Sequence, residues 1–188
     1  MPIHQAMLII SALIGSWLGM QAVHELGHVV AAWMTGGQVK QVVLHPLAIS
    51  RTDYAHNPRP LATVWAGPLV GVLLPVAASS LAALFAWRGA FLLRFFAGFC
   101  LIANGAYIAG GATSAIGDCG EMLRHGSPLW LLWLFGVLTV PAGLWLWNGQ
   151  GRHFGLGEAR GKVDRGAAYV MLGVCVVLVL IELLVDAR

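Results

Sequence analysis

The chain has 188 residues, of which 59% are hydrophobic and only 10% are charged. A water-soluble domain carries about 25% charged residues, so this composition excludes a soluble globule. It also excludes a disordered chain, which needs low hydrophobicity and high net charge. Three cysteines without paired spacing exclude a disulfide scaffold and a C-x-x-C zinc finger. The net charge of +3 comes from basic residues scattered among the connections and gives no indication of nucleic-acid binding.

Five long apolar runs dominate the sequence, at residues 6–34, 61–87, 91–116, 129–147 and 167–185. Only three charged residues, Glu25, Arg94 and Glu182, fall inside these runs. A helix needs about 20 apolar residues to cross the hydrocarbon core, and each run should be helical because lipid cannot hydrogen-bond an open backbone. The pattern predicts an all-α polytopic membrane protein with about five transmembrane helices. We expect it in a bacterial inner membrane.

Residues at the ends of the runs agree with this interpretation. Trp87 ends the second run, and Trp147 ends the fourth, as indoles do at membrane surfaces. Arg94 and Glu182 lie near run ends, where we expect their charged groups to reach toward water.

The first run lacks a basic n-region and is longer than the apolar part of a signal peptide, so we expect an uncleaved span. Lysine and arginine are divided too evenly between the two sides to fix the orientation.

The connection after the first run predicts a β-hairpin. Gly36 and Gly37 are a stop signal for the first helix. Residues 38–44 are then β-prone, His45-Pro46 favours a turn, and residues 47–52 can return as a second strand. We therefore expect a small membrane-associated β-hairpin at residues 38–52, after the first transmembrane helix.

The connection at residues 148–166 is rich in glycine and charge. It contains Gly155-Leu156-Gly157, but it has neither the lysine spacing of a Walker motif nor a preceding strand, so a nucleotide site is not indicated. We expect a flexible, solvated loop, and neither nucleotide nor nucleic acid as a partner.

The residues that indicate chemistry are concentrated at positions 24–28, which spell H-E-x-x-H inside the first run. Helical positions four apart differ by about 40° around the axis, so His24 and His28 can bind one cation. Glu25 then lies beside the metal, where it can take a proton from a metal-bound water. The alternative is a polar patch between two helices or an exposed helix end. Imidazoles and a carboxylate at membrane depth are costly unless something compensates, which favours a bound divalent cation.

A catalytic zinc site usually needs a third protein ligand. The strongest candidate is Asp118, which directly follows the third apolar run between glycines. A helix-ending turn residue is the alternative for this position. Glu121, His125 and Cys119 are the other possible ligands.

Two further positions inside the runs invite a functional interpretation. Asn104 carries an amide midway along the third run, where it can donate to a substrate carbonyl or a developing oxyanion, or simply bond a neighbouring helix. Gly67 begins a small-xxx-small pattern that ends at Gly71. Helix packing is a sufficient explanation of that pattern, and lining a substrate gate is a second one.

The H-E-x-x-H motif at residues 24–28, Gly67-Pro68 in the second run and Asp118 after the third run together resemble the site-2 protease family of intramembrane zinc metalloproteases. The resemblance covers roughly residues 6–124. It implies one zinc ion per chain, held by His24, His28 and Asp118, with Glu25 as general base.

The resemblance also implies an organisation. Residues 1–125 would form the catalytic core, with three transmembrane helices and the hairpin at 38–52. Residues 126–188 would add two transmembrane helices joined by the polar loop at 148–166.

The function implied is hydrolysis of peptide bonds in transmembrane substrates by metal-activated water, within the lipid bilayer. We expect an extended substrate segment to pair with the hairpin's edge strand at Val42 and Val43. In the family, an asparagine upstream of the ligand aspartate handles substrate, a role that falls on Asn104. Two alternatives stay open: a membrane zinc-binding or transport protein without hydrolytic activity, and an inactive relative that binds membrane helices.

Overall fold

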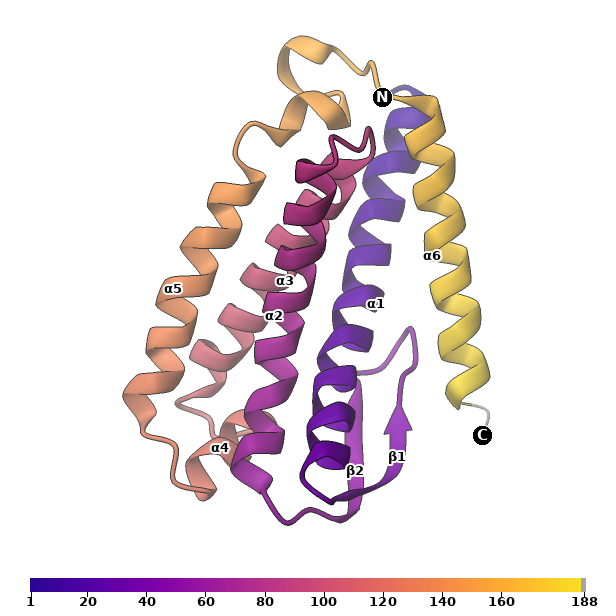
Figure 1. Cartoon of the computed structure of the whole chain (residues 1–188). Coiled ribbons are helices and arrows are strands. Elements are labelled where there is room, and N and C mark those ends of the chain that lie inside the picture. The colour runs from indigo at the N-terminus through magenta and orange to yellow at the C-terminus, as the bar shows by residue number, and fades with distance from the viewer. Residues whose placement is uncertain (187–188) are drawn as a thin grey trace.

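The computed structural model describes residues 1–186 as a bundle of long helices with a small hairpin at one end (Figure 1). The elements in chain order are α1 (Ile3–Met34), β1 (Gln38–Val43), β2 (Arg51–His56), α2 (Pro60–Leu84), α3 (Ala90–Gly111), α4 (Asp118–Arg124), α5 (Leu129–Trp147), the 3-10 helices η1 (Gln150–Phe154) and η2 (Gly157–Ala159), and α6 (Arg165–Asp186). Within residues 1–186, five helices are long and apolar enough to cross a membrane. The predicted all-α polytopic fold with a hairpin after the first span is confirmed.

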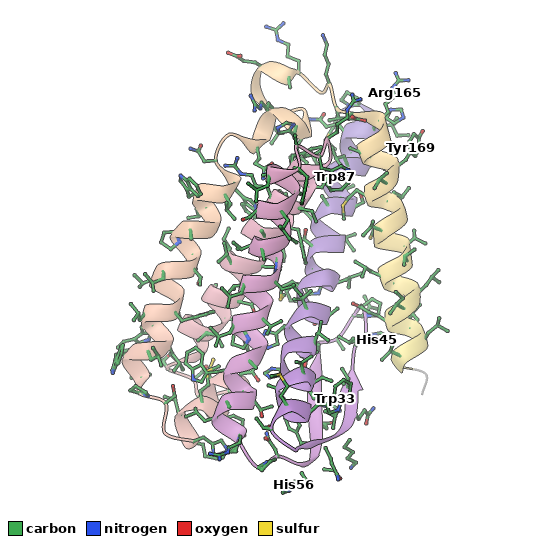
Figure 2. All side chains as sticks on the ribbon, viewed as in Figure 1. Trp33, His45, His56, Trp87, Arg165 and Tyr169 are labelled. Atoms are coloured by element: carbon green, nitrogen blue, oxygen red, sulfur yellow. The ribbon has the colours of Figure 1, made fainter. Side chains whose placement is uncertain are left out.

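The two ends of the bundle differ in content. The hairpin and α4 lie at one end, and the connection with η1 and η2 lies beside the N-terminus at the other. Figure 2 shows Trp33 at the hairpin end and Trp87 and Tyr169 at the opposite end, which is the placement of aromatic side chains at the two surfaces of a bilayer. The chain is therefore an integral, multi-pass membrane protein.

Small residues bring the spans into close contact. A Cβ atom on Gly27 of α1 would clash with the backbone carbonyl of Ala66 in α2. Between α3 and α5, a Cβ atom on Gly143 would lie only 2.7 Å from the carbonyl oxygen of Gly98. Membrane helices cannot use the hydrophobic effect against lipid, so they associate through such close backbone packing.

The hairpin differs from the prediction in its second strand. β2 begins at Arg51, whereas the sequence predicts a strand over residues 47–52. The turn is longer because Pro46 has no N–H for a ladder and because Ser50 donates its backbone N–H to Oε1 of Gln21 on α1 at 2.9 Å. The antiparallel register pairs Val42 with Thr52 and is irregular around Lys40.

The third apolar run also ends earlier than its composition indicates. The helix stops at Gly111, although apolar residues continue to position 116. Residues 112–115 form a turn, and Ala115 has φ +52°, a left-handed conformation that does not continue the helix. A turn then leads to α4, a short helix that the sequence analysis does not predict and that begins at Asp118.

Most residues of the connection at 148–166 are exposed, in agreement with the solvated loop expected from its composition, but the connection is not without structure. It contains two 3-10 helices, and the side chain of Phe154 is buried. Gln5 on α1 donates through Nε2 to the carbonyl oxygens of Phe154 and Gly155, at 3.1 and 3.0 Å. These bonds and the buried ring hold the connection against the first helix.

The two charged residues near run ends behave differently. Arg94 is exposed and donates through Nε to the carbonyl oxygen of Leu146 at 2.7 Å, so its charged group reaches the end of α5. Glu182 does not reach water, which corrects the prediction. Its side chain is only 2% exposed, and neither carboxyl oxygen has a hydrogen-bond partner among the described residues.

We therefore expect Glu182 to destabilise the fold. A buried polar group without a partner costs about 1–3 kcal/mol, so we expect Glu182→Leu to raise the free energy of unfolding by about that amount. Thermal melting of the purified protein in detergent measures the change. Glu158→Leu, on the exposed connection between η1 and α6, is the control and should leave the melting temperature nearly unchanged. A lower melting temperature for Glu182→Leu would show that the carboxyl group has a stabilising partner.

Candidate metal centre

Three side chains of the predicted site converge at the hairpin end of the bundle. His24 and His28 come from one face of α1, and Asp118 is the first residue of α4. Nε2 of His24 lies 2.8 Å from Oδ2 of Asp118 and 3.1 Å from Nε2 of His28, and the third edge, from His28 to Asp118, measures 3.4 Å. Tetrahedral zinc ligands at about 2.0–2.1 Å from the ion are about 3.3 Å apart. The triangle is therefore close to the size that one zinc ion requires.

The second nitrogen of each imidazole has a fixed partner. Nδ1 of His24 lies 2.7 Å from Oδ1 of Asn104, and Nδ1 of His28 lies 2.9 Å from the carbonyl oxygen of Thr63. The amide of Asn104 is oriented by its own Nδ2, which donates to the carbonyl oxygen of Cys100 at 2.9 Å. Both Nδ1 atoms can therefore donate a proton to these oxygens. The lone pair of each Nε2 atom is then available to a cation shared with Asp118. Hydrogen bonds of this kind orient the histidine ligands of metals.

The chemistry of this donor set fits a divalent cation. Two Nε2 atoms and a carboxylate oxygen face one another, and because each Nδ1 is bonded to an oxygen, each of the three atoms can offer a lone pair to a cation. The three groups match the two nitrogens and one carboxylate of a catalytic zinc site with an open fourth position.

Local backbone geometry at the start of α4 positions Asp118. Gly117 has φ +58° and ψ −138°, a conformation that side chains with a Cβ atom rarely adopt. A Cβ atom there would also clash with the hydroxyl of Tyr107. That hydroxyl accepts the backbone N–H of Asp118 at 3.1 Å, and the thiol of Cys119 donates to the carbonyl oxygens of Tyr107 and Ile108. Asp118 and Cys119, the two residues after the glycine, are thus hydrogen-bonded to residues near the end of α3.

Glycines on α2 make room for this arrangement. A Cβ atom on Gly67 would lie 2.9 Å from Nε2 of His24 and even closer to Nε2 of His28. A Cβ atom on Gly71 would lie 3.0 Å from the amide of Asn104. The small-xxx-small pattern of α2 therefore accommodates the imidazoles and their amide partner, in addition to letting two helices approach.

Glu25 is buried beside the two histidines and is held by the hairpin. Its side chain is only 3% exposed, and its Oε2 accepts a hydrogen bond from Oγ1 of Thr52 in β2 at 2.6 Å. Thr52 escaped the sequence analysis because nothing in a single strand indicates which helix it will contact.

A cavity of about 980 Å³ adjoins these groups. Its wall includes His24, Glu25, His28, Asn104, Asp118, five consecutive residues of the hairpin from Ser50 to Tyr54, and apolar side chains such as Trp17, Met20, Ile49 and Val64. The wall of the cavity thus combines polar side chains, among them the three that converge, with apolar ones.

Of the residues predicted to bind substrate, Asn104 lines the cavity, and Val42, Val43 and Gly67 do not. Val42 and Val43 on β1 do not line the cavity, whereas β2 does. Asn104 lines it, but both ends of its amide are already bonded to His24 and Cys100. Gly67 lies against the imidazoles. The strand facing the site could not be chosen from the sequence, because either strand of a hairpin can turn toward the bundle.

The other possible ligands lie outside the group of three. Glu121 forms ion pairs with Arg124 and with His125, the latter at 3.3 Å, and the thiol of Cys119 points to the end of α3. Among the described residues, one group of three His, Cys, Asp or Glu side chains is arranged to hold a metal ion, and it consists of His24, His28 and Asp118.

Two tyrosines at the cavity also escaped the sequence analysis. Tyr107 supports Asp118, and Tyr54 lies two residues after Thr52 in β2, on the same face of the strand. Burial raises the pKa of Tyr54, and the negative charges of Glu25 and Asp118 raise it further. Tyr54 therefore lies within the electrostatic field of both carboxylates.

We expect Gly67→Ala to weaken binding of a divalent metal by about 10–100-fold, the range seen when the surroundings of metal ligands are disturbed. The added Cβ atom would displace the imidazoles of His24 and His28 from their common point. Metal content and affinity can be measured on the purified protein by elemental analysis and competition with a chelator. Gly173→Ala is the matched control, because a Cβ atom there meets nothing within 4 Å. Equal affinity in both variants would contradict the assigned geometry.

Comparison with known proteins gives one match. A family model described as Peptidase M50B-like matches residues 9–113 of the 188. The matched stretch contains the H-E-x-x-H motif, Gly67 and Asn104, and it ends five residues before Asp118. Comparisons with curated proteins and with solved structures give no match. More than half of the chain is covered by the match, and the chain belongs to the Peptidase M50B-like family, that is, to the site-2 protease family.

Proposed function

We propose that this protein is an intramembrane zinc metalloprotease that hydrolyses peptide bonds of transmembrane substrates. The observation that supports this best is the convergence of His24, His28 and Asp118 within 4.8 Å of one another, beside a buried carboxylate and a large cavity. His24, His28 and Asp118 would hold one zinc ion per chain. Bound zinc would polarise the scissile carbonyl and lower the pKa of a water molecule.

Glu25 acts as the general base in this proposal. One of its oxygens, Oε2, is occupied by the hydroxyl of Thr52, which leaves Oε1 to accept a proton from the attacking water. The same oxygen can deliver that proton to the leaving amine nitrogen, so the carboxylate is regenerated. The bond to Thr52 restricts rotation of the Glu25 side chain and keeps Oε1 directed to one place.

The substrate enters as an extended segment along β2. The sheet has only two strands, so β2 has an unpaired edge that can add a further strand through backbone hydrogen bonds. Four residues of β2, Arg51–Tyr54, line the cavity, whereas β1 contributes only Lys40. Pairing at β2 rather than at Val42 and Val43 would therefore present a scissile amide to Glu25. A transmembrane substrate must unwind locally to pair in this way.

Tyr54 is the donor for the oxyanion that develops on the scissile carbonyl. Its side chain lines the cavity on the same face of β2 as Thr52, and its hydroxyl makes no hydrogen bond to another described side chain or backbone group. Asn104 is the other candidate for the oxyanion donor, but its amide is already hydrogen-bonded to His24 through Oδ1 and to the carbonyl oxygen of Cys100 through Nδ2. A preorganised donor at this position stabilises the transition state more than the substrate.

The first test replaces the base. We expect Glu25→Gln to retain zinc and to lose cleavage of a model transmembrane peptide by about 10²–10⁴-fold, because the amide accepts the bond from Thr52 but cannot take a proton. Glu158→Gln, at the opposite end of the bundle, is the control and should cleave normally. Unchanged cleavage by Glu25→Gln would contradict the assigned role. Zinc without cleavage in the wild type would support a transport or storage protein, and absence of zinc would support an inactive relative.

The second test removes the Tyr54 hydroxyl. Loss of one oxyanion donor reduces kcat by about 10²–10³-fold in other hydrolases, so we expect Tyr54→Phe to lower kcat by about 10²-fold, with KM and zinc content unchanged. Tyr169→Phe, on α6 at the opposite end, is the matched control. An increased KM with unchanged kcat would show that Tyr54 only binds substrate.

A further inference from the structure

A second cavity, of about 290 Å³, lies at the end of the bundle opposite to the hairpin. Two connections that are far apart in the sequence form it. Arg88 and Phe91 come from the start of α3 and the turn before it, and residues 152–164 come from the connection between α5 and α6. Its lining consists of Arg88, Phe91, Arg152, His153, Lys162, Val163 and Asp164.

The cations that line this cavity have no ionic partners. Arg88, Arg152 and Lys162 form no ion pair with any residue in the described range. Asp164 is the one carboxylate in the lining, and its Oδ1 accepts the backbone N–H of Ala167 at 3.1 Å at the start of α6. Three cations against one carboxylate leave an excess of positive charge. Burial lowers the pKa of His153, and the charges of Arg152 and Arg94 lower it further, as a positive field requires.

The wall that carries these cations is ordered. The ring of His153 stacks on Phe91, with centroids 4.7 Å apart and planes inclined by 13°. Phe154 next to it is buried and its carbonyl is bonded to Gln5. The stacked and buried rings hold the backbone at Arg152, and Arg88, Arg152 and Lys162 line the same cavity.

The cavity lies at the level of lipid headgroups. α3 has 22 residues and is about 33 Å long, which matches the hydrocarbon thickness of about 30 Å. Arg88 precedes this helix and so lies just outside the hydrocarbon layer. The neighbouring Trp87 is about half exposed and lies at the same end of the bundle as Tyr169 and Arg165 (Figure 2), as expected at a membrane surface.

We propose that this cavity binds the phosphate of an anionic membrane phospholipid. Arginine suits a phosphate group because its planar fork donates two parallel hydrogen bonds, and lysine adds a point charge. The apolar side chains of Phe91 and Val163 in the same lining favour a lipid over a soluble phosphate, since they can contact the glycerol and the first acyl carbons. The site lies on the membrane face opposite to the hairpin and the cavity at Glu25, and it does not depend on the proposed proteolytic activity.

The experiment measures binding of fluorescent phosphatidylglycerol to the full chain in detergent, with unlabelled phosphatidylglycerol, phosphatidylcholine and inorganic phosphate as competitors. A cation near an anionic lipid surface contributes enough to change binding about fivefold. We therefore expect the double variant Arg152→Gln/Lys162→Gln to weaken binding at least tenfold. The matched control Arg160→Gln/Arg165→Gln removes the same charge from the same connection but not from the cavity, and should change binding less than twofold.

Three results would overturn the proposal. Equal weakening by both double variants would indicate a general surface potential rather than a site. Competition by inorganic phosphate as strong as that by phosphatidylglycerol would identify a soluble phosphate ligand instead, and equal binding of phosphatidylcholine would remove the preference for an anion. Thermal melting checks that the variants fold. Arg88→Gln removes one cation of the cavity from a different connection, and we expect it to weaken phosphatidylglycerol binding about fivefold.

Discussion

The arrangement at the hairpin end depends on one constraint: the two imidazoles of α1 point into the same small space beside the cavity. Nδ1 of His24 is hydrogen-bonded to the side-chain oxygen of Asn104, and Nδ1 of His28 to the carbonyl oxygen of Thr63. The two Nε2 atoms therefore face each other at a distance of 3.1 Å. Asp118 brings further negative charge to the same point. A divalent cation, as proposed here, would hold this group of acceptors together, and it would account for the convergence of groups from α1, α2, α3 and α4 on one place.

Helix packing and site geometry are consequently the same problem in this protein. α2 supplies a backbone carbonyl to His28 and withholds side chains at Gly67 and Gly71, where a Cβ atom would meet the imidazoles or Asn104. In a membrane, small residues are already favoured at helix contacts because lipid offers no hydrophobic drive for association. A larger residue at either position would both separate α2 from its neighbours and disturb the candidate metal centre.

Features with a local cause were predictable from the sequence. The spans follow from the length of apolar runs, and the pairing of His24 with His28 follows from the pitch of a helix. Asp118 could be proposed as a ligand from its place after the third run, although α4, which carries it, could not. The strand that faces the cavity, the bond from Thr52 to Glu25 and the folded connection at residues 148–166 depend on contacts between distant segments. The division into a core at 1–125 and two added helices stays a prediction.

In the proposed mechanism, the hairpin would connect substrate position to the chemistry of the site. Thr52 fixes the base, and Tyr54 follows two residues later, about 6.7 Å along the same face of β2. A segment that pairs with the free edge of this strand acquires the same spacing, because strands in a sheet share their rise per residue. The amide opposite this pair would then lie between a carboxylate that accepts a proton and a hydroxyl that donates one. Backbone pairing alone would achieve this alignment, so a substrate needs a segment that can unwind more than it needs a particular sequence.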